Sequence, residues 1–171
     1  MEDNTKDNMK DNMKSNTYIT NNSAQTKKMG KMLAEEILKS KESKKHAFVI
    51  CLKGDLGSGK TTFLQGFAKG LSIREKILSP TFVIMKKFKI PKRKNVHGSR
   101  FPAHSLYHFD CYRIGKPKEI LELGFEKIIS CSNNIVAIEW PEKINKLLPK
   151  NTLMLKFEFL DENTRKITFS N

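Results

Sequence analysis

The sequence predicts an α/β fold in three layers, with a mixed, mainly parallel central sheet and antiparallel strands at one side. Residues 46–52 (HAFVICL) and 134–140 (NIVAIEW) are continuous apolar runs of strand length, a pattern typical of parallel strands that are covered on both faces. Residues 153–159 and 165–169 instead alternate apolar and polar side chains, which indicates antiparallel strands at one side of the sheet. Helical segments between these runs complete the prediction.

The chain of 171 residues has the length of one domain and can bury a core without a disulfide or a structural metal. Its three cysteines, Cys51, Cys111 and Cys131, are far apart and form no CxxC pair, which argues against a zinc site and a disulfide framework. No apolar stretch has the length of a signal peptide or a membrane span. We therefore expect a cytoplasmic protein that makes no contact with a membrane.

The formal net charge is +14 at pH 7. Such a charge attracts polyanions such as RNA, or acidic protein partners, with a strength that falls as salt rises. Lysine greatly outnumbers arginine and is accompanied by many asparagine and isoleucine residues, a pattern that compositional bias of a genome also produces. Charge alone does not choose between these explanations.

Residues 1–17 contain the polar repeat KDNMKDNMKSN, which offers too little apolar area to offset the entropy of ordering. We expect a disordered tail here and a single domain over 18–171, beginning with a short strand at 18–20. From Ser23, a candidate N-cap, apolar residues recur at helical spacing until about Ser40.

The remaining elements follow in order. Residues 61–70 (TTFLQGFAKG) predict a helix that ends at Gly70, a plausible C-cap. Strands are expected at 81–88 and 105–110. Residues 118–130 (KEILELGFEKIIS) predict one or two short helices broken at Gly124.

The stretch GDLGSGKTT, residues 54–62, matches the phosphate-loop pattern Gly-x-x-x-x-Gly-Lys-Thr. Its glycines allow successive N–H groups to point at a phosphate, and the helix that follows favours an anion at its N-terminus. The alternative is a glycine turn with a surface lysine, but a buried strand before the loop and a helix after it favour a P-loop NTPase-like fold. The loop residues that we expect to bind ATP are Asp55, Leu56, Gly57, Ser58, Gly59, Lys60, Thr61 and Thr62.

In this reading, Lys60 neutralises the β- and γ-phosphates and the Thr61 hydroxyl binds Mg²⁺. A hydrolytic site also needs an acid near the metal and a group that orients water. Glu139 and Asp110 each end an apolar run, and ligands of open α/β sheets gather at such strand ends. Either carboxylate is a candidate metal ligand or catalytic group, and the alternative for each is a solvated strand end.

Three further positions have a structural and a functional interpretation. Ser79-Pro80-Thr81 is either a rigid turn or a sensor of the γ-phosphate, with Thr81 in a catalytic role. Trp140 is either a core anchor or a lid over the nucleotide or a contact for a partner. His108 is more typical of a structural histidine than of a base.

Five segments occur in an order that resembles the bacterial tRNA threonylcarbamoyladenosine-biosynthesis ATPase family, TsaE, and the likeness extends over about residues 18–160. They are GDLGSGKTT, SPTF (79–82), HFDCYR (108–113), LGFE (123–126) and EWPE (139–142).

The resemblance implies a small ATPase, weak alone, that supports the threonylcarbamoyl transferase complex formed by TsaD and TsaB. It places the family's magnesium threonine at Thr61, its glutamate at Glu139 and its HxDxYR aspartate at Asp110. The threonine that lies near the nucleotide base falls on Thr26, and the tryptophan of the EWP motif on Trp140. The implied cofactors are ATP and Mg²⁺.

The chain departs from the family pattern in its tail and in a segment at 86–104 that we expect to be a basic loop insertion. Residues 86–100 carry seven Lys or Arg and no acid. This run is either a solvated hairpin tip or a surface that faces tRNA, with Phe88 and Phe101 available to stack on bases.

Two other functions stay open at this point. A small-molecule P-loop kinase needs a lid that supplies arginines, whereas the five arginines of this chain are not obviously grouped. A basic RNA-binding module with an idle P-loop is the third reading.

Overall fold

A computed structural model describes residues 16–40, 45–80, 83–91 and 103–170. Its centre is a sheet with the strand order β1-β7-β6-β2-β5-β4-β3. The strands β6, β2, β5 and β4 run parallel, whereas β3, β7 and β1 are each antiparallel to their neighbours. The strand bounds are β1 Asn16–Thr20, β2 Phe48–Lys53, β3 Met85–Lys89, β4 Ser105–Asp110, β5 Asn134–Glu139, β6 Leu153–Phe159 and β7 Arg165–Ser170.

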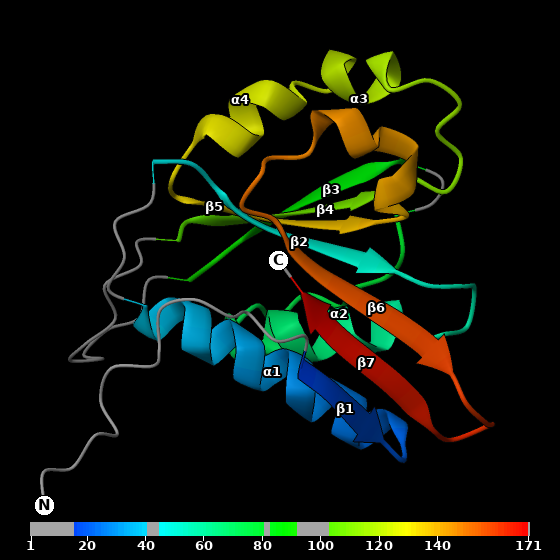
Figure 1. Cartoon of the computed structure of the whole chain (residues 1–171). Helices are drawn as coiled ribbons and strands as arrows, with labels where there is room; N and C mark the ends of the chain where they lie inside the picture. Colours follow the sequence, from blue (N-terminus) through cyan, green and yellow to red (C-terminus); the bar gives the residue numbers. More distant parts are fainter. Residues whose placement is uncertain (1–15, 41–44, 81–82, 92–102, 171) are drawn as a thin grey trace, which may run out of the picture.

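Helices cover both faces of this sheet (Figure 1). The first layer holds α1, Ser23–Lys39, and α2, Lys60–Gly70. The opposite layer holds α3, Lys118–Glu122, α4, Phe125–Ser130, and the 3₁₀ helix η1, Pro141–Leu147. The predicted three-layer α/β fold with a mixed sheet is therefore confirmed.

Alternate residues of β2 enter two separate cores. Ile50 and Leu52 pack in the cluster that contains α1 and α2, and Val49 and Cys51 pack in the cluster on the other face. A strand covered on both faces has no polar side to show. This explains why the apolar run in the sequence is continuous.

The C-terminal strands β6 and β7 lie at one side of the sheet, as the alternating pattern predicted, and they also join its parallel part. β6 and β7 are antiparallel to each other, as expected, but β6 also pairs in parallel with β2. β1 adds to the outer edge of β7. The C-terminal hairpin is thus built into the main sheet, beside the loop that leaves β2.

Two predicted helix caps are wrong. Asn22, not Ser23, caps α1, because its side chain accepts a hydrogen bond from the Gln25 N–H at 2.9 Å. Gly70 lies inside α2 and is not a left-handed cap. It is required for packing, since a Cβ there would lie 2.5 Å from the Lys31 carbonyl oxygen on α1.

Boundaries at both ends of the basic segment also differ from the predictions. β3 begins at Met85, whereas the strand was expected from residue 81. Lys86 to Lys89 therefore belong to an edge strand, not to an inserted loop, and residues 92–102 of the expected insertion lie outside the described part of the chain. Phe88 is fully buried in the α1 and α2 core, so it does not stack on bases; Phe101 lies outside the described residues.

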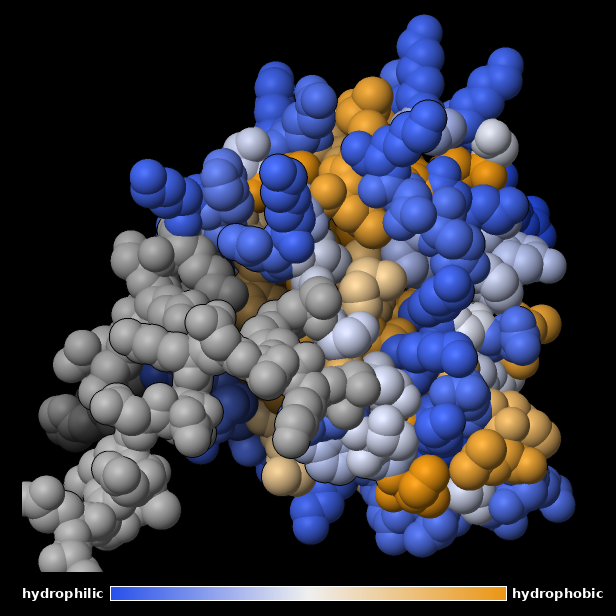
Figure 2. All heavy atoms as spheres, in the orientation of Figure 1, coloured by the Kyte–Doolittle hydropathy of each residue, from blue (hydrophilic) through white to orange (hydrophobic). Residues whose placement is uncertain are grey.

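The tail prediction is two residues too long, since Asn16 and Thr17 already pair with β7. Residues 1–15 lie outside the described part. Over the described ranges, no helix combines the length and the apolar character needed to cross a membrane. In the orientation of Figure 1, the face of the molecule shown in Figure 2 carries mainly hydrophilic side chains, with apolar groups between them.

Candidate functional site

The glycine-rich loop joins the end of β2 to the start of α2. Gly57 and Gly59 adopt φ values of 77° and 101°, in the left-handed region that favours glycine. Gly54 has no room for a side chain, because a Cβ there would lie 2.5 Å from the Phe157 carbonyl oxygen on β6. The three glycines thus let the loop turn tightly against the sheet before α2 begins at Lys60.

Lys60 is folded back onto this loop. Its Nζ donates to the carbonyl oxygens of Gly54 at 2.7 Å and Asp55 at 2.8 Å, and lies 4.7 Å from the centre of the Trp140 ring. Burial lowers the pKa of the Lys60 ammonium, and the nearby Glu139 carboxylate opposes that shift. A polyphosphate in the loop would offer this buried cation a charged acceptor in place of two neutral carbonyls.

The two predicted carboxylates lie side by side at the carboxyl ends of neighbouring parallel strands. Asp110 on β4 and Glu139 on β5 are Cα partners in the sheet, and their exposed fractions are only 2% and 3%. Ser79 Oγ donates to Asp110 Oδ2, and the Tyr112 N–H donates to Oδ1 at 2.9 Å. The two strand ends therefore form an acidic floor beside the loop.

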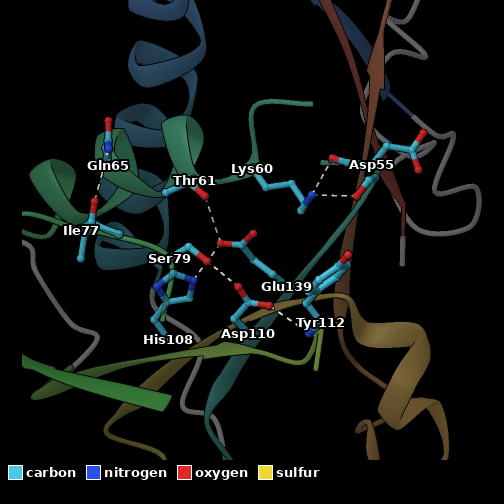
Figure 3. A network of polar contacts seen from close by, with 11 residues as sticks. Asp55, Lys60, Thr61, Gln65, Ile77, Ser79, His108, Asp110, Tyr112 and Glu139 are labelled. Atoms are coloured by element: carbon cyan, nitrogen blue, oxygen red, sulfur yellow. Dashed lines mark hydrogen bonds and ion pairs between the residues drawn. The ribbon is translucent and has the colours of Figure 1, made fainter. Parts of the chain in front are cut away.

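Glu139 is shared by two side chains, as Figure 3 shows. Its Oε1 lies 3.4 Å from Thr61 Oγ1, at the start of α2, and 2.9 Å from His108 Nε2, on β4. The hydrogen bond joins His108 Nε2 to Glu139 Oε1, and an ionised carboxylate would accept it. His108, interpreted from sequence as structural, therefore fixes the orientation of the acid nearest Thr61.

These groups line one cavity of about 450 Å³, a size typical of small-molecule sites. Asp110, Glu139 and Ser79 lie in its wall with eight of the residues expected to bind nucleotide, namely Thr26, Leu56, Gly57, Gly59, Lys60, Thr61, Thr62 and Trp140.

Trp140 contributes to both the cavity and the core. It packs against the core on the α3 and α4 side of the sheet, and its ring lies 5.1 Å from that of Tyr112. Its backbone is left-handed, with φ of 57° at the start of η1. Trp140 therefore anchors the core, as one interpretation of the sequence expected, and also lines the cavity. Its roles as a lid over the nucleotide or as a contact for a partner stay predictions.

Three predicted residues have contacts or burial that bear on their roles, and a fourth is not described. Asp55 reaches Lys60 through its backbone carbonyl while its side chain is exposed. Ser58 is buried, and its Oγ has no hydrogen-bond partner among the described residues. The Thr26 hydroxyl is paired with that of Thr20 at 2.8 Å. Thr81 lies outside the described part of the chain.

The cavity also contains residues that the sequence did not identify. They come from the start of α1, from the segment after β4, and from the β6–β7 turn, which lies about a hundred residues beyond the loop and carries no motif. They are Asn22, Ser23, Tyr112, Glu162, Asn163 and Arg165.

The oxygen atoms of this site fit Mg²⁺. Thr61 and Glu139 bring a hydroxyl and a carboxylate within 3.4 Å of each other, and Mg²⁺ prefers oxygen ligands with one or two protein groups, the rest being water and phosphate. The described residues contain no group of three or more His, Cys, Asp or Glu side chains able to hold a metal alone. Thr61 and Glu139 would leave the other ligand positions of Mg²⁺ to water and phosphate oxygens.

Comparisons with known proteins find similarity over most of the chain. Residues 20–167 match the model of a family described as Threonylcarbamoyl adenosine biosynthesis protein TsaE. A protein of Rickettsia felis named tRNA threonylcarbamoyladenosine biosynthesis protein TsaE is 37% identical over 86% of this chain and 75% of its own length. A Haemophilus influenzae protein with the same name is 31% identical over 79% and 77%.

A solved structure of a similar protein has the same fold. The crystal structure of Bacillus subtilis YdiB superimposes with a TM-score of 0.66 at 30% sequence identity, covering 91% of this chain and 84% of that one.

Proposed function

The chain belongs to the TsaE family, and from that membership we propose that it is the ATP-hydrolysing component of tRNA threonylcarbamoyladenosine modification. The observation that carries the hydrolytic part is the contact of Thr61 with Glu139 beside a buried loop lysine. These groups stand where a nucleotide triphosphate and its metal need a cation, a hydroxyl and a carboxylate.

The chemistry that we propose is in-line attack of water on the γ-phosphate of ATP. Lys60 neutralises the β- and γ-phosphates. Thr61 and one of the two carboxylates would hold Mg²⁺, which would supply positive charge to neutralise the charge that develops on the phosphate. Glu139 or Asp110 orders the attacking water, and Ser79, held by Asp110, or Thr81 senses the terminal phosphate.

The proposed partners are the transferase subunit TsaD and its companion TsaB. In this proposal hydrolysis is slow in the isolated protein and rises when the complex forms, because the work is done on another protein. The substrate tRNA is reached through that complex.

The test is phosphate release from Mg-ATP with and without the two partners. Lys60→Ala and Thr61→Ala should each abolish turnover, while Lys69→Ala, an exposed lysine on the same helix, should leave it unchanged. If Lys60→Ala hydrolysed ATP at the wild-type rate in the complex, the site would be wrongly assigned. If the partners had no effect on the wild type, the proposed partnership would fail.

A small-molecule kinase is not supported by the family or by its named relatives. Phosphate release without an added acceptor separates the two activities. Binding of tRNA that is indifferent to ATP and Mg²⁺ would instead favour the RNA-binding module.

We also propose that the basic segment 86–100 faces tRNA within the complex. Lys86, Lys87 and Lys89 are exposed on the edge strand β3, so charge rather than aromatic stacking supports this contact. Lys92, Arg93 and Lys94 lie outside the described residues, and replacing them with serine gives a separate test: unchanged tRNA affinity and salt dependence would count against their part in it.

A further inference from the structure

The β6–β7 turn is fastened to the phosphate loop by one side chain, Arg165. Its Nη2 donates to the Gly57 carbonyl at 3.3 Å. Its Nη1 donates to three carbonyls of the turn: Asp161 at 2.8 Å, Thr164 at 3.0 Å and Glu162 at 3.3 Å. One guanidinium thus joins two segments that are far apart in the sequence.

The stem of Arg165 is also held in place. Its Cγ would lie 3.6 Å from a Cβ added at Gly59, so the stem lies alongside the loop. The guanidinium carbon lies 4.5 Å from the centre of the Phe159 ring. Such contacts limit the rotamers of a long side chain, so its hydrogen bonds cost less entropy to form.

The residues that line the cavity fall into two groups, each linked by its own contacts, and we refer to these groups as the two ends of the cavity. Thr61, Glu139, Asp110 and Ser79 gather at the end suited to the terminal phosphate and its metal. The turn lies at the other end, where Arg165 is the Cα partner of Thr20 and Thr20 bonds to Thr26 in α1. The walls of this second end are Asn22, Ser23, Thr26, Glu162 and Asn163.

Because the terminal phosphate occupies the acidic end, the nucleoside must extend toward the second end. We propose that Arg165 is a positioning residue that fastens the nucleoside end of the site to the phosphate loop. It binds the Gly57 carbonyl and keeps the turn against the base and ribose. Arg165 therefore sets the affinity for nucleotide and not the rate of the chemical step. This inference rests on the proposed function, since it assumes that the cavity takes ATP.

The test compares Arg165→Met, Arg165→Lys and the control Lys166→Met. Lys166 is next in the strand, pairs with Glu158 and does not line the cavity. Calorimetry would measure the binding of ADP and of inorganic tripolyphosphate, each with Mg²⁺, and steady-state kinetics would measure ATP hydrolysis in the complex.

We expect Arg165→Met to weaken ADP about tenfold, because the hydrogen bond to Gly57 that joins the turn to the loop is lost, and to weaken tripolyphosphate clearly less. KM for ATP should rise similarly, while kcat changes less than about twofold. Arg165→Lys should recover part of the ADP affinity through one remaining donor, and Lys166→Met should match the wild type.

Three results would overturn the inference. They are unchanged ADP affinity in Arg165→Met, an equal loss for ADP and tripolyphosphate, and a melting temperature of the nucleotide-free variant lowered by more than about 10 °C, which would place Arg165 in the general fold. Failure of the wild type to bind either ligand would instead refute the proposed function itself.

Discussion

Glu139 is the residue on which the contacts of the acidic end converge. Its Oε1 is hydrogen-bonded to His108 Nε2 and lies beside Thr61, and the carboxylate is almost fully buried. A buried charge that two neighbours orient is preorganised for a cation. The amide of glutamine would keep the shape and the contact with His108 but lose the charge.

We therefore expect Glu139→Gln to reduce ATP hydrolysis in the complex by about 100-fold. Affinity for ADP without metal should change little, whereas the gain that Mg²⁺ gives should be lost; calorimetry with and without Mg²⁺ measures this. Glu142→Gln, an exposed carboxylate three residues on, is the control. Full activity of Glu139→Gln would remove Glu139 from the mechanism.

The three cysteines should differ sharply in reactivity. Burial raises the pKa of the Cys111 thiol to about 12 and raises the pKa of Cys51 as well, whereas Cys131 is exposed. Because the thiolate is the reactive form, a disulfide reagent at pH 8 should label one thiol in the native protein and three in denaturant. Rapid labelling of a second thiol would show that the core around β2 opens readily.

At the residue scale, the sequence predicted the location of a side chain well where the end of a strand is enough to define that location. Asp110 and Glu139 could be placed together because parallel strands end at the same edge of a sheet. Arg165 could not, because its contact with Gly57 depends on β6 pairing with β2 and on the course of the β6–β7 turn. His108 was interpreted as structural because a histidine is more often structural than a base; its partner Glu139, 31 residues away on the next strand, was not identified.

At the scale of elements, α1 and α2 pack with their backbones unusually close. A Cβ at Gly66 would lie 1.8 Å from the Lys27 carbonyl oxygen, and one at Gly30 would lie 2.2 Å from that of Phe63. Both neighbours are backbone atoms, which cannot rotate away, so the helices must separate to admit a methyl group.

Gly66→Ala should accordingly lower the free energy of unfolding by at least about 2 kcal/mol and the melting temperature by about 4–8 °C. Alanine's higher helix propensity acts in the opposite direction and is smaller. Thermal and urea denaturation measure the change, with Lys69→Ala on the exposed face of α2 as control. A variant as stable as the wild type would mean that this helix pair is looser than described.

The β6–β7 turn is organised by its own carboxylate. Asp161 Oδ1 accepts from the N–H groups of Asn163 and Thr164, both at 2.9 Å. The hydrogen bond from the Asn163 backbone is the main cause that lowers the pKa of Asp161 below 3.8. A lowered carboxyl pKa means that the contribution to stability is present above pH 3.8 and is lost as pH falls through the pKa of the folded state.

An NMR titration should therefore find the Asp161 carboxyl midpoint below 3.8. Asp161→Asn, which keeps an oxygen acceptor but cannot titrate, should remove this part of the acid dependence of the turn's chemical shifts. A midpoint at or above 3.8 would mean that the turn is not closed in solution.

Element boundaries were least predictable where packing replaced a local rule. A glycine at position 70 is the residue type expected at a helix C-cap, but its small size is needed so that α1 can pack closely against α2. No local sequence pattern reveals such a contact. The first strand residues at 81–84 were predicted from apolar character, yet Val83 and Ile84 turn back to the Pro80 carbonyl. Long runs such as β2 and β5 were located well because both their faces are buried.

At the scale of the whole molecule, the excess of basic charge is spread over many exposed lysines. Some lie on the edge strand β3, within the segment 86–100 that carries seven cations and no acid. Others lie on α3 and α4, across the sheet from α1 and α2 (Figure 1). General attraction and a defined tRNA surface therefore make different predictions for two sets of lysines with the same total charge.

The variant Lys86→Ser, Lys87→Ser, Lys89→Ser should weaken tRNA binding by the complex if β3 faces the nucleic acid. The slope of log affinity against log salt is negative, and each lost phosphate contact reduces its magnitude by about 0.7–0.9. Loss of three contacts should therefore reduce the magnitude by about 2–3. The variant Lys116→Ser, Lys118→Ser, Lys127→Ser removes the same charge from exposed positions of the other layer and should change the slope much less. Equal effects from the two variants would show that net charge alone attracts tRNA. If the β3 variant had no effect, tRNA would contact another part of the complex. Three neighbouring lysines that bind phosphates cannot be removed without a loss of counterion release.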